Sequence, residues 1–185
     1  IENPRFFRTD ETSLAKTQRQ LTREVARSKE NGSRERNRTE QTTRYTPAVN
    51  KRLKAVRKVH KRIAHRRENF VQQETRTIVD WYGAIYVEGL NIQSMLKNHR
   101  LAKSIADAAW GMFVQILAYK AEEAGRRFTR VPPEGTTQRC SGRNCGKLVP
   151  KDLSVRIHAC PHCQLVLDRD LNAARNICAL GRQCL

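Results

Sequence analysis

Four cysteines arranged as two close pairs constrain this chain more than any other feature. Cys140 and Cys145 are separated by four residues, Cys160 and Cys163 by two, and 14 residues lie between the pairs. Such spacing can place four thiolates around one tetrahedral ion, with each sulfur about 2.3 Å from zinc. Because four thiolates fill the coordination shell, the spacing predicts a structural Zn²⁺ site.

The residues around the cysteines fit two metal-binding turns. Gly142 and Gly146 give the first turn conformational freedom, and Pro161 shapes the second. The segment 147–159 between the pairs has room for a small β-hairpin. Together these features predict a compact metal-bound module.

Other interpretations of the cysteines explain less. A disulfide framework needs an oxidising compartment, and the N-terminal residues show no secretory signal, which favours a reducing cytoplasm. A redox C-x2-C pair would leave the other pair unexplained. His158 and His162 could replace a ligand, but four cysteines already suffice, so both are expected on the surface. Cys178 and Cys184 are expected to be ordinary thiols.

Charge points to a polyanionic partner. The sequence has 36 Lys and Arg against 18 Asp and Glu, a formal charge of +18. Such an excess favours nucleic acid, since bound phosphates release their counterions. A membrane surface would also attract the charge, but no long apolar run or lipidation signal supports it, so no membrane partner is expected.

The densest positive charge falls on one stretch, residues 51–67, which contains no acidic residue. Like charges on one helix repel each other unless a partner screens them, so this stretch is a predicted nucleic-acid contact; a solvated helix face is the alternative. The predicted contact residues are Lys51, Arg52, Lys54, Arg57, Lys58, Lys61, Arg62, Arg66 and Arg67.

Hydrophobic periodicity in the first 80 residues predicts two helices. Residues 1–7 alternate weakly and are expected to form a short strand. Helical periodicity follows at about 12–28, then a polar segment that includes Asn31-Gly32, and then a long helix over about 48–80. Two helices around one polar turn predict an antiparallel helical hairpin.

The rest of the chain mixes strands and helices, which predicts an α/β fold. Residues 84–87 and 127–131 are expected to be strands, with an amphipathic helix over 101–124 between them. The final segment 168–177 is expected to be a helix whose packed face carries Leu171, Ala174 and Ile177.

Two carboxylates occupy places where metal chemistry is conceivable. Glu88 follows a buried strand, and Asp170 lies near a predicted helix start. Converging carboxylates can hold Mg²⁺ for phosphodiester cleavage. From these residues alone a solvated or salt-bridged Glu88 and a helix cap at Asp168 or Asp170 explain the pattern better. Asp107, within an amphipathic helix, is assigned a structural role.

Several sequence segments, taken in chain order, change the balance between the metal-site interpretation of these carboxylates and the simpler ones. VEGLNIQSM with NHRLAKSIADAAWGMF, then PPEGTTQRCSGRNCG, then CPHCQLVLDRDLNAARNI strongly resemble the C-terminal part of the transposon-encoded TnpB family. These proteins are RNA-guided nucleases related to type V CRISPR effectors. IENPRFFR, the helical hairpin and RENF resemble the family too, so the resemblance covers nearly the whole chain.

The resemblance implies an incomplete RNase H-like (RuvC) core with a helical-hairpin insertion at about 12–80 and an inserted zinc ribbon. By analogy, residues 1–135 are part of the core, 136–166 the ribbon and 167–185 the final core segment. It implies Mg²⁺-dependent DNA cleavage directed by a guide RNA, with Glu88 and Asp170 as two of three catalytic carboxylates. It also places the zinc ligands on the four paired cysteines.

The departures from the family pattern matter as much. The family's first catalytic Asp lies upstream of the position that matches IENPRFF, so the chain is expected to lack it, and Asp10 does not replace it. Gln164 stands where the family usually has Gly. Because the first catalytic Asp is expected to be missing, the chain is expected to cleave DNA only when the missing segment is supplied. It is expected to be cytoplasmic and nucleoid-associated. The alternatives are a non-catalytic nucleic-acid-binding remnant or a zinc-ribbon module for protein interaction.

Overall fold

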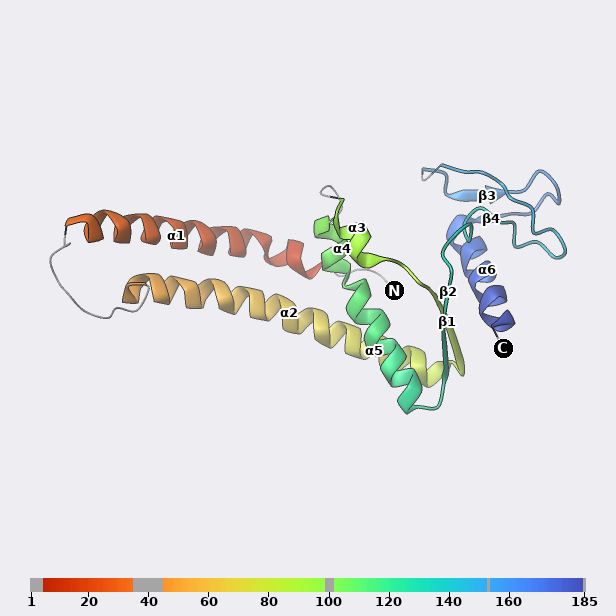
Figure 1. The fold of residues 1–185 in the computed structure, drawn as a ribbon, viewed down its shortest axis with the longest axis horizontal. Helices are drawn as coiled ribbons and strands as arrows, with labels where there is room; N and C mark the ends of the chain where they lie inside the picture. The colour runs from red at the N-terminus through yellow and green to blue at the C-terminus, as the bar shows by residue number, and fades with distance from the viewer. Residues whose placement is uncertain (1–4, 35–44, 99–101, 153, 185) are drawn as a thin grey trace. The chain divides into compact units, whose positions relative to one another are not determined.

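The computed structural model describes residues 5–34, 45–98, 102–152 and 154–184. Its elements, in chain order, are α1 (Phe6–Arg34), α2 (Pro47–Trp81), β1 (Ala84–Glu88), α3 (Ile92–Leu96), α4 (Ala102–Ala108), α5 (Trp110–Glu123), β2 (Arg127–Val131), β3 (Ile157–Ala159), β4 (Val166–Asp168) and α6 (Arg169–Gln183) (Figure 1). They form two compact units: one comprises 1–74 with 98–110, the other 75–97 with 111–185.

The first unit is built on the helical hairpin that the periodicity predicts. The ring of Phe6 contacts that of Phe70 at a centroid distance of 5.9 Å, and Gln20 accepts a hydrogen bond from Arg52. Partner numbers fall along α2 as they rise along α1, so the two helices run antiparallel, as Figure 1 shows. Their interface has a buried apolar core of Leu14, Val59 and Ile63.

The start and end of α1 differ from the predictions. The strand expected over residues 1–7 is wrong where the structure describes it, because Phe6 and Phe7 belong to α1 and pack on the hairpin core. The turn expected at Asn31-Gly32 is also wrong, since α1 continues through both to Arg34. Residues 35–44, which make up most of the rest of the predicted polar segment, lie outside the described residues.

The second unit contains the two predicted strands, which pair in parallel. Ala84 faces Arg127 at one end, and Glu88 faces Val131 at the other. α6 packs against both strands. The apolar core combines the end of α2, β1 and α5 through Val79, Ile85, Leu117 and Ala121.

The helix predicted over 101–124 is divided into α4 and α5. The break is at Ala109, whose φ of 52° is left-handed and ends α4. The two halves pack differently: Asp107 on α4 bonds to Arg67 in the first unit, whereas Leu117 on α5 is in the core of the second. Leu101 lies outside the described residues.

Short antiparallel pairings flank the two cysteine turns. Arg139 bridges Leu148 around the first turn, and β3 pairs with β4 around the second, with Ile157 opposite Asp168. The hairpin expected within 147–159 is therefore replaced by one that spans 157–168.

α6 begins at Arg169 and covers the rest of the helix predicted over 168–177, but it buries a different face. Asn172, Ala173 and Asn176 are its buried residues in that range, whereas Leu171 is 47% exposed. Two asparagines on the buried face are possible only because their side chains are hydrogen-bonded. In the described part of the chain, no helix is sufficiently long and apolar to cross a membrane.

Candidate functional site

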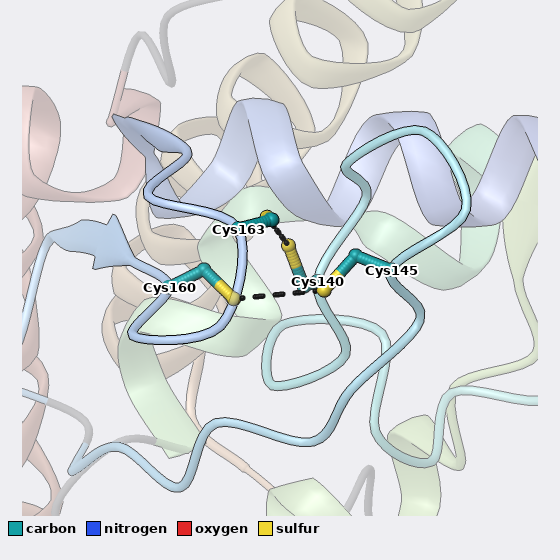
Figure 2. A group of neighbouring side chains, drawn as sticks. All are labelled: Cys140, Cys145, Cys160 and Cys163. Atoms are coloured by element: carbon teal, nitrogen blue, oxygen red, sulfur yellow. Dashed lines mark hydrogen bonds between the residues drawn. The ribbon is translucent and has the colours of Figure 1, made fainter.

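The four paired cysteines lie together. Figure 2 shows Cys140 and Cys145 on one loop facing Cys160 and Cys163 on another. The Sγ atoms of Cys140 and Cys163 are 3.5 Å apart, those of Cys145 and Cys160 are 3.7 Å apart, and all four lie within 4.8 Å of one another. Four sulfurs at about 2.3 Å from one tetrahedral zinc would be separated by about 3.8 Å. The donor set and its dimensions therefore fit a metal ion.

The backbone holds the two turns in shape. Cys140 donates to Lys147 O at 2.9 Å, and Cys160 donates to Leu165 O at 2.9 Å. Gln164 has a φ of 61°, a conformation that Gly adopts without strain. Gly142 has a different role from the turning freedom expected of it: a Cβ there would lie 3.0 Å from Cys163 Sγ, so a side chain would crowd the sulfurs.

The sulfurs differ in their environments. Burial raises the pKa of the Cys140 thiol to about 12, and the neighbouring thiols act in the same direction. Burial also acts to raise the pKa of Cys160, but backbone N–H groups of Cys163 and His162, together with the thiols of Cys140 and Cys163, outweigh it and lower that pKa to about 6. One sulfur is thus prepared to be a thiolate, and a bound cation would displace the protons of the others.

His158 contradicts the prediction that it lies on the surface. Its side chain is fully buried in β3, and its Nδ1 contacts Nζ of Lys151. Burial and the neighbouring Lys151 charge lower the pKa of His158, and burial lowers the pKa of Lys151. His162, in contrast, is exposed as expected.

Glu88 ends β1 and is half-buried. Its Oε1 accepts a hydrogen bond from Thr136 Oγ1 at 2.5 Å, and Thr136 is only 3% exposed. A short bond to an ionised acceptor is the stronger kind. A solvated or salt-bridged Glu88 was expected; the structure instead shows a half-buried Glu88 held by a buried hydroxyl, and no salt bridge to it is found among the described residues.

The sequence left open whether Asp168 or Asp170 caps α6 and whether Asp170 is available for metal binding. Asp168 is the N-cap, and its Oδ1 accepts from the backbone N–H groups of Asp170 at 2.8 Å and Leu171 at 3.1 Å. Asp170 is not the cap: its side chain is 72% exposed, with Oδ1 3.5 Å from Arg169 Nε. Asp170 is therefore available for another role.

The structure does not show Glu88 and Asp170 in one ligand cluster. They lie on β1 and α6, which pack against each other. Within the described residues, the four cysteines are the only group of three or more close metal-binding side chains.

The nine basic residues of the predicted contact, all in the part of α2 from 51 to 67, fall into two sets. Arg62 and Arg66 pair with buried Asp10 at 3.5 and 3.1 Å. Arg67 bonds to Asp107 at 2.9 Å, which gives Asp107 the structural role predicted for it, and Arg52 donates to Gln20. The remaining five are all exposed: Lys51, Lys54, Arg57, Lys58 and Lys61.

Three residues near the site were missed from the sequence. Thr136 bonds to Glu88, while Asn172 and Asn176 bond to the backbone between Thr136 and Ser141. Asn172 and Asn176 are four residues apart on one helix face, a spacing that could have indicated a shared polar contact. Nothing in the local sequence links Thr136 to a residue 48 positions earlier.

These features define the class: a mixed helix and strand protein with a cysteine cluster placed directly before its last helix. A family model described as "Probable transposase" matches residues 1–99, and one described as "Cas12f1-like, TNB domain" matches residues 110–177. The first covers more than half of the 185 residues. The chain therefore belongs to the TnpB-like family of transposon-associated RNA-guided DNA endonucleases.

Individual relatives agree with this assignment. A "Putative RNA-guided DNA endonuclease" of Streptomyces pristinaespiralis is 35% identical over 98% of this chain and 40% of its own length. "TnpB-like protein L79" of Acanthamoeba polyphaga mimivirus is 30% identical over 69% of this chain and 25% of its own length. The chain thus spans less than half of each of these relatives.

A solved structure resembles the fold. The match is the "Cryo-EM structure of the Cas12f1-sgRNA-target DNA complex", with a TM-score of 0.52 and 21% identity, over 71% of this chain and 38% of that one. At that identity the match supports a shared fold for the aligned part.

Proposed function

We propose that this chain is a portion of a TnpB-like, RNA-guided DNA endonuclease and supplies two carboxylates, Glu88 and Asp170, to its Mg²⁺ site. The observation that carries the proposal is Glu88, held by a buried hydroxyl at the carboxyl end of β1 in a chain of this family. Carboxylate oxygens are the donors that Mg²⁺ prefers. Bound Mg²⁺ would activate water and stabilise the leaving oxygen of a phosphodiester.

In this proposal the parts of the chain have separate tasks. Residues 1–135 belong to an RNase H-like (RuvC) core with the helical hairpin as its insertion, 136–166 form the zinc ribbon, and 167–185 complete the core. The third carboxylate comes from a segment that precedes the matched region in relatives. The four cysteines hold Zn²⁺ as a structural ion, because their thiolates leave no coordination position for substrate.

Nucleic acid is the proposed partner, as a guide RNA and a target DNA in the nucleoid. The exposed residues of the predicted α2 contact support this, because no ion pair to them is found in the described fold: Lys51, Lys54, Arg57, Lys58 and Lys61. Arg62, Arg66 and Arg67 contact nucleic acid less in this view, since buried carboxylates already engage them. The proposed contact is thus narrower than the nine residues that composition alone indicated.

The test is a cleavage assay with Mg²⁺, guide RNA and target DNA, on the chain alone and joined to the upstream segment of its S. pristinaespiralis relative. We expect no cleavage by the chain alone and cleavage by the joined protein. Glu88→Ala and Asp170→Ala should each abolish it, whereas Glu134→Gln, a change at an exposed carboxylate, should not. Cleavage that survives Glu88→Ala would refute the assignment. Binding without cleavage in the joined protein would favour a non-catalytic nucleic-acid-binding role.

A further inference from the structure

We propose that Thr136 is a positioning residue for Glu88, and that Asn172 and Asn176 of α6 hold its segment in place between Glu88 and the cysteine cluster. This inference rests on the proposed function, since it concerns the carboxylate assigned there to Mg²⁺. It adds residues that lie outside the four cysteines and the two carboxylates.

The strand pairing brings Thr136 to Glu88. β1 and β2 are parallel, and Glu88 and Val131, their last residues, lie opposite each other at the C-terminal end of the sheet. Gly89 N–H donates to Val131 O at 2.8 Å, a backbone hydrogen bond just past the last residue of β1. The chain that leaves β2 therefore begins directly beside Glu88.

A tight turn then directs the segment inward. Pro132-Pro133 follows Val131 and ends the ladder, because proline has no N–H to donate. Gly135 has a φ of +74°, a conformation that turns the chain. Thr136, the next residue, is buried at 3% exposure.

The Thr136 hydroxyl has one proton and two acceptors within reach. Glu88 Oε1 is 2.5 Å from Oγ1, and Pro133 O is 3.2 Å away. A hydroxyl donates only one hydrogen bond, and the shorter contact with the carboxylate takes it. The bond engages one oxygen of Glu88 and fixes the plane of the carboxylate, which orients the other oxygen. In metal sites, such partners of a ligand set its orientation.

Two asparagines of α6 hold the backbone of residues 136–141 by hydrogen bonds. Asn176 Nδ2 donates to Thr136 O at 2.8 Å and to Arg139 O at 2.6 Å. Asn172 Nδ2 donates to Arg139 O at 2.8 Å, while its Oδ1 accepts from Ser141 N at 2.9 Å. The bonds fix the backbone from Thr136, beside Glu88, to the residue that follows Cys140. Aspartate could not replace either asparagine, because a carboxylate donates no hydrogen bond to a carbonyl.

The alternative is that Thr136 only satisfies a buried contact and stabilises the fold. The two roles differ in what the hydroxyl controls. A fold-stabilising residue affects the stability of the unit, whereas a positioning residue affects how Glu88 binds a cation in a protein that remains folded. Cation affinity, measured separately from stability, distinguishes them.

The experiment uses the zinc-loaded chain and Mn²⁺, a paramagnetic substitute for Mg²⁺, with broadening of the Glu88 amide signal measured by NMR during titration. Thr136→Val removes the hydroxyl at nearly constant shape, Thr136→Ser keeps it, and Thr137→Val makes the same change one residue along. We expect Thr136→Val to raise the Mn²⁺ concentration for half-maximal broadening at least about tenfold. The other two variants should stay within about twofold of wild type. Zinc content and melting temperature report whether each variant is folded.

Each outcome decides a different question. Wild-type titration of Thr136→Val, or equal weakening in Thr136→Ser, would overturn the positioning role. Glu88→Gln separates the two proposals: if it abolishes broadening while Thr136→Val does not, only the positioning role fails. If Glu88→Gln titrates with Mn²⁺ as the wild type does, Glu88 is no cation ligand and both proposals fail.

A second measurement needs no variant, so it remains decisive if Thr136→Val does not fold. The hydroxyl proton of Thr136 in the wild-type chain should exchange slowly with water and show a nuclear Overhauser contact to the γ protons of Glu88. A hydroxyl in rapid exchange would overturn the inference.

Discussion

Gly181 of α6 lies directly against the ring of Tyr86 on β1, so closely that a Cβ at position 181 would overlap the ring carbons Cγ and Cδ1. The absence of a side chain at 181 therefore sets how near α6 approaches the strand. The same helix carries Asn172 and Asn176, which bond to the 136–141 segment.

Replacing this glycine should loosen the second unit. Gly181→Ala adds a methyl group to a filled space and should cost about 1–3 kcal/mol of unfolding free energy, more than the roughly 1 kcal/mol that alanine gains from helix propensity. Urea denaturation measures the difference. Gly111→Ala is the control, because nothing lies within 4 Å of its added Cβ. Adding Tyr86→Ala should recover part of the loss, since contacting residues are not additive; equal stability of Gly181→Ala and wild type would contradict the packing argument.

Local patterns predicted the parts of the fold that depend on local physics. Helical periodicity indicated α2 because its core residues recur along one face, and the spacing of the cysteines indicated the cluster because metal coordination constrains short turns. The break at Ala109 was not predictable in this way. It depends on two packing surfaces, one on each side of the residue, and the apolar pattern continues across it.

Long-range hydrogen bonds account for most of the remaining differences. Asn172 and Asn176 are buried because they bond to backbone carbonyls 33 to 40 residues away, so apolar periodicity selected the wrong face of α6. Asp10 and Asp107 neutralise part of the basic stretch of α2 from 40 to 56 residues away. A count of charges along α2 cannot include them.

The pair between Asp107 and Arg67 should be important for the stability of the first unit. Asp107 Oδ1 accepts from Arg67 at 2.9 Å and from the backbone N–H of Phe7 at 3.0 Å, and its side chain is 4% exposed. Asp107→Ala leaves Arg67 and that N–H without their acceptor and should cost about 2–4 kcal/mol. Thermal and urea unfolding followed by circular dichroism measure it.

A surface pair supplies the matched control for Asp107. Asp80 pairs with Arg76 at 3.0 Å on α2, but both side chains are largely exposed. Asp80→Ala should change stability by less than about 1 kcal/mol, since exposed ion pairs contribute little. Equal effects of the two substitutions would show that the contact of Asp107 is no more important than a surface pair.

The exposed charges of α2 should govern the salt dependence of nucleic-acid binding. Each phosphate contact contributes about 0.9 to the slope of log K against log salt on duplex DNA. Lys58→Gln with Lys61→Gln should therefore flatten the slope by about 1–2. Fluorescence anisotropy across a salt series measures this. Arg126→Gln with Arg127→Gln removes the same charge from an exposed position at β2 and should leave the slope nearly unchanged. Equal flattening by both pairs would mean that only net charge matters.

The cysteine cluster should bind one zinc per chain and require it for local folding. Cys163→Ser removes one of four ligands and should lower the zinc content, measured by native mass spectrometry, from one to near zero. Cys178→Ser, which alters a thiol outside the cluster, should retain it. Because zinc binding energy is folding energy at such sites, chelation should abolish the amide protection of residues 140–163. Acidification should do the same, since protons compete with zinc for the thiolates.

If Asn172 and Asn176 join this cluster to the Thr136 segment, chelation should also increase hydrogen exchange at Thr136 and Thr137. Faster exchange confined to residues 140–163 would show that the cluster folds independently of the segment beside Glu88.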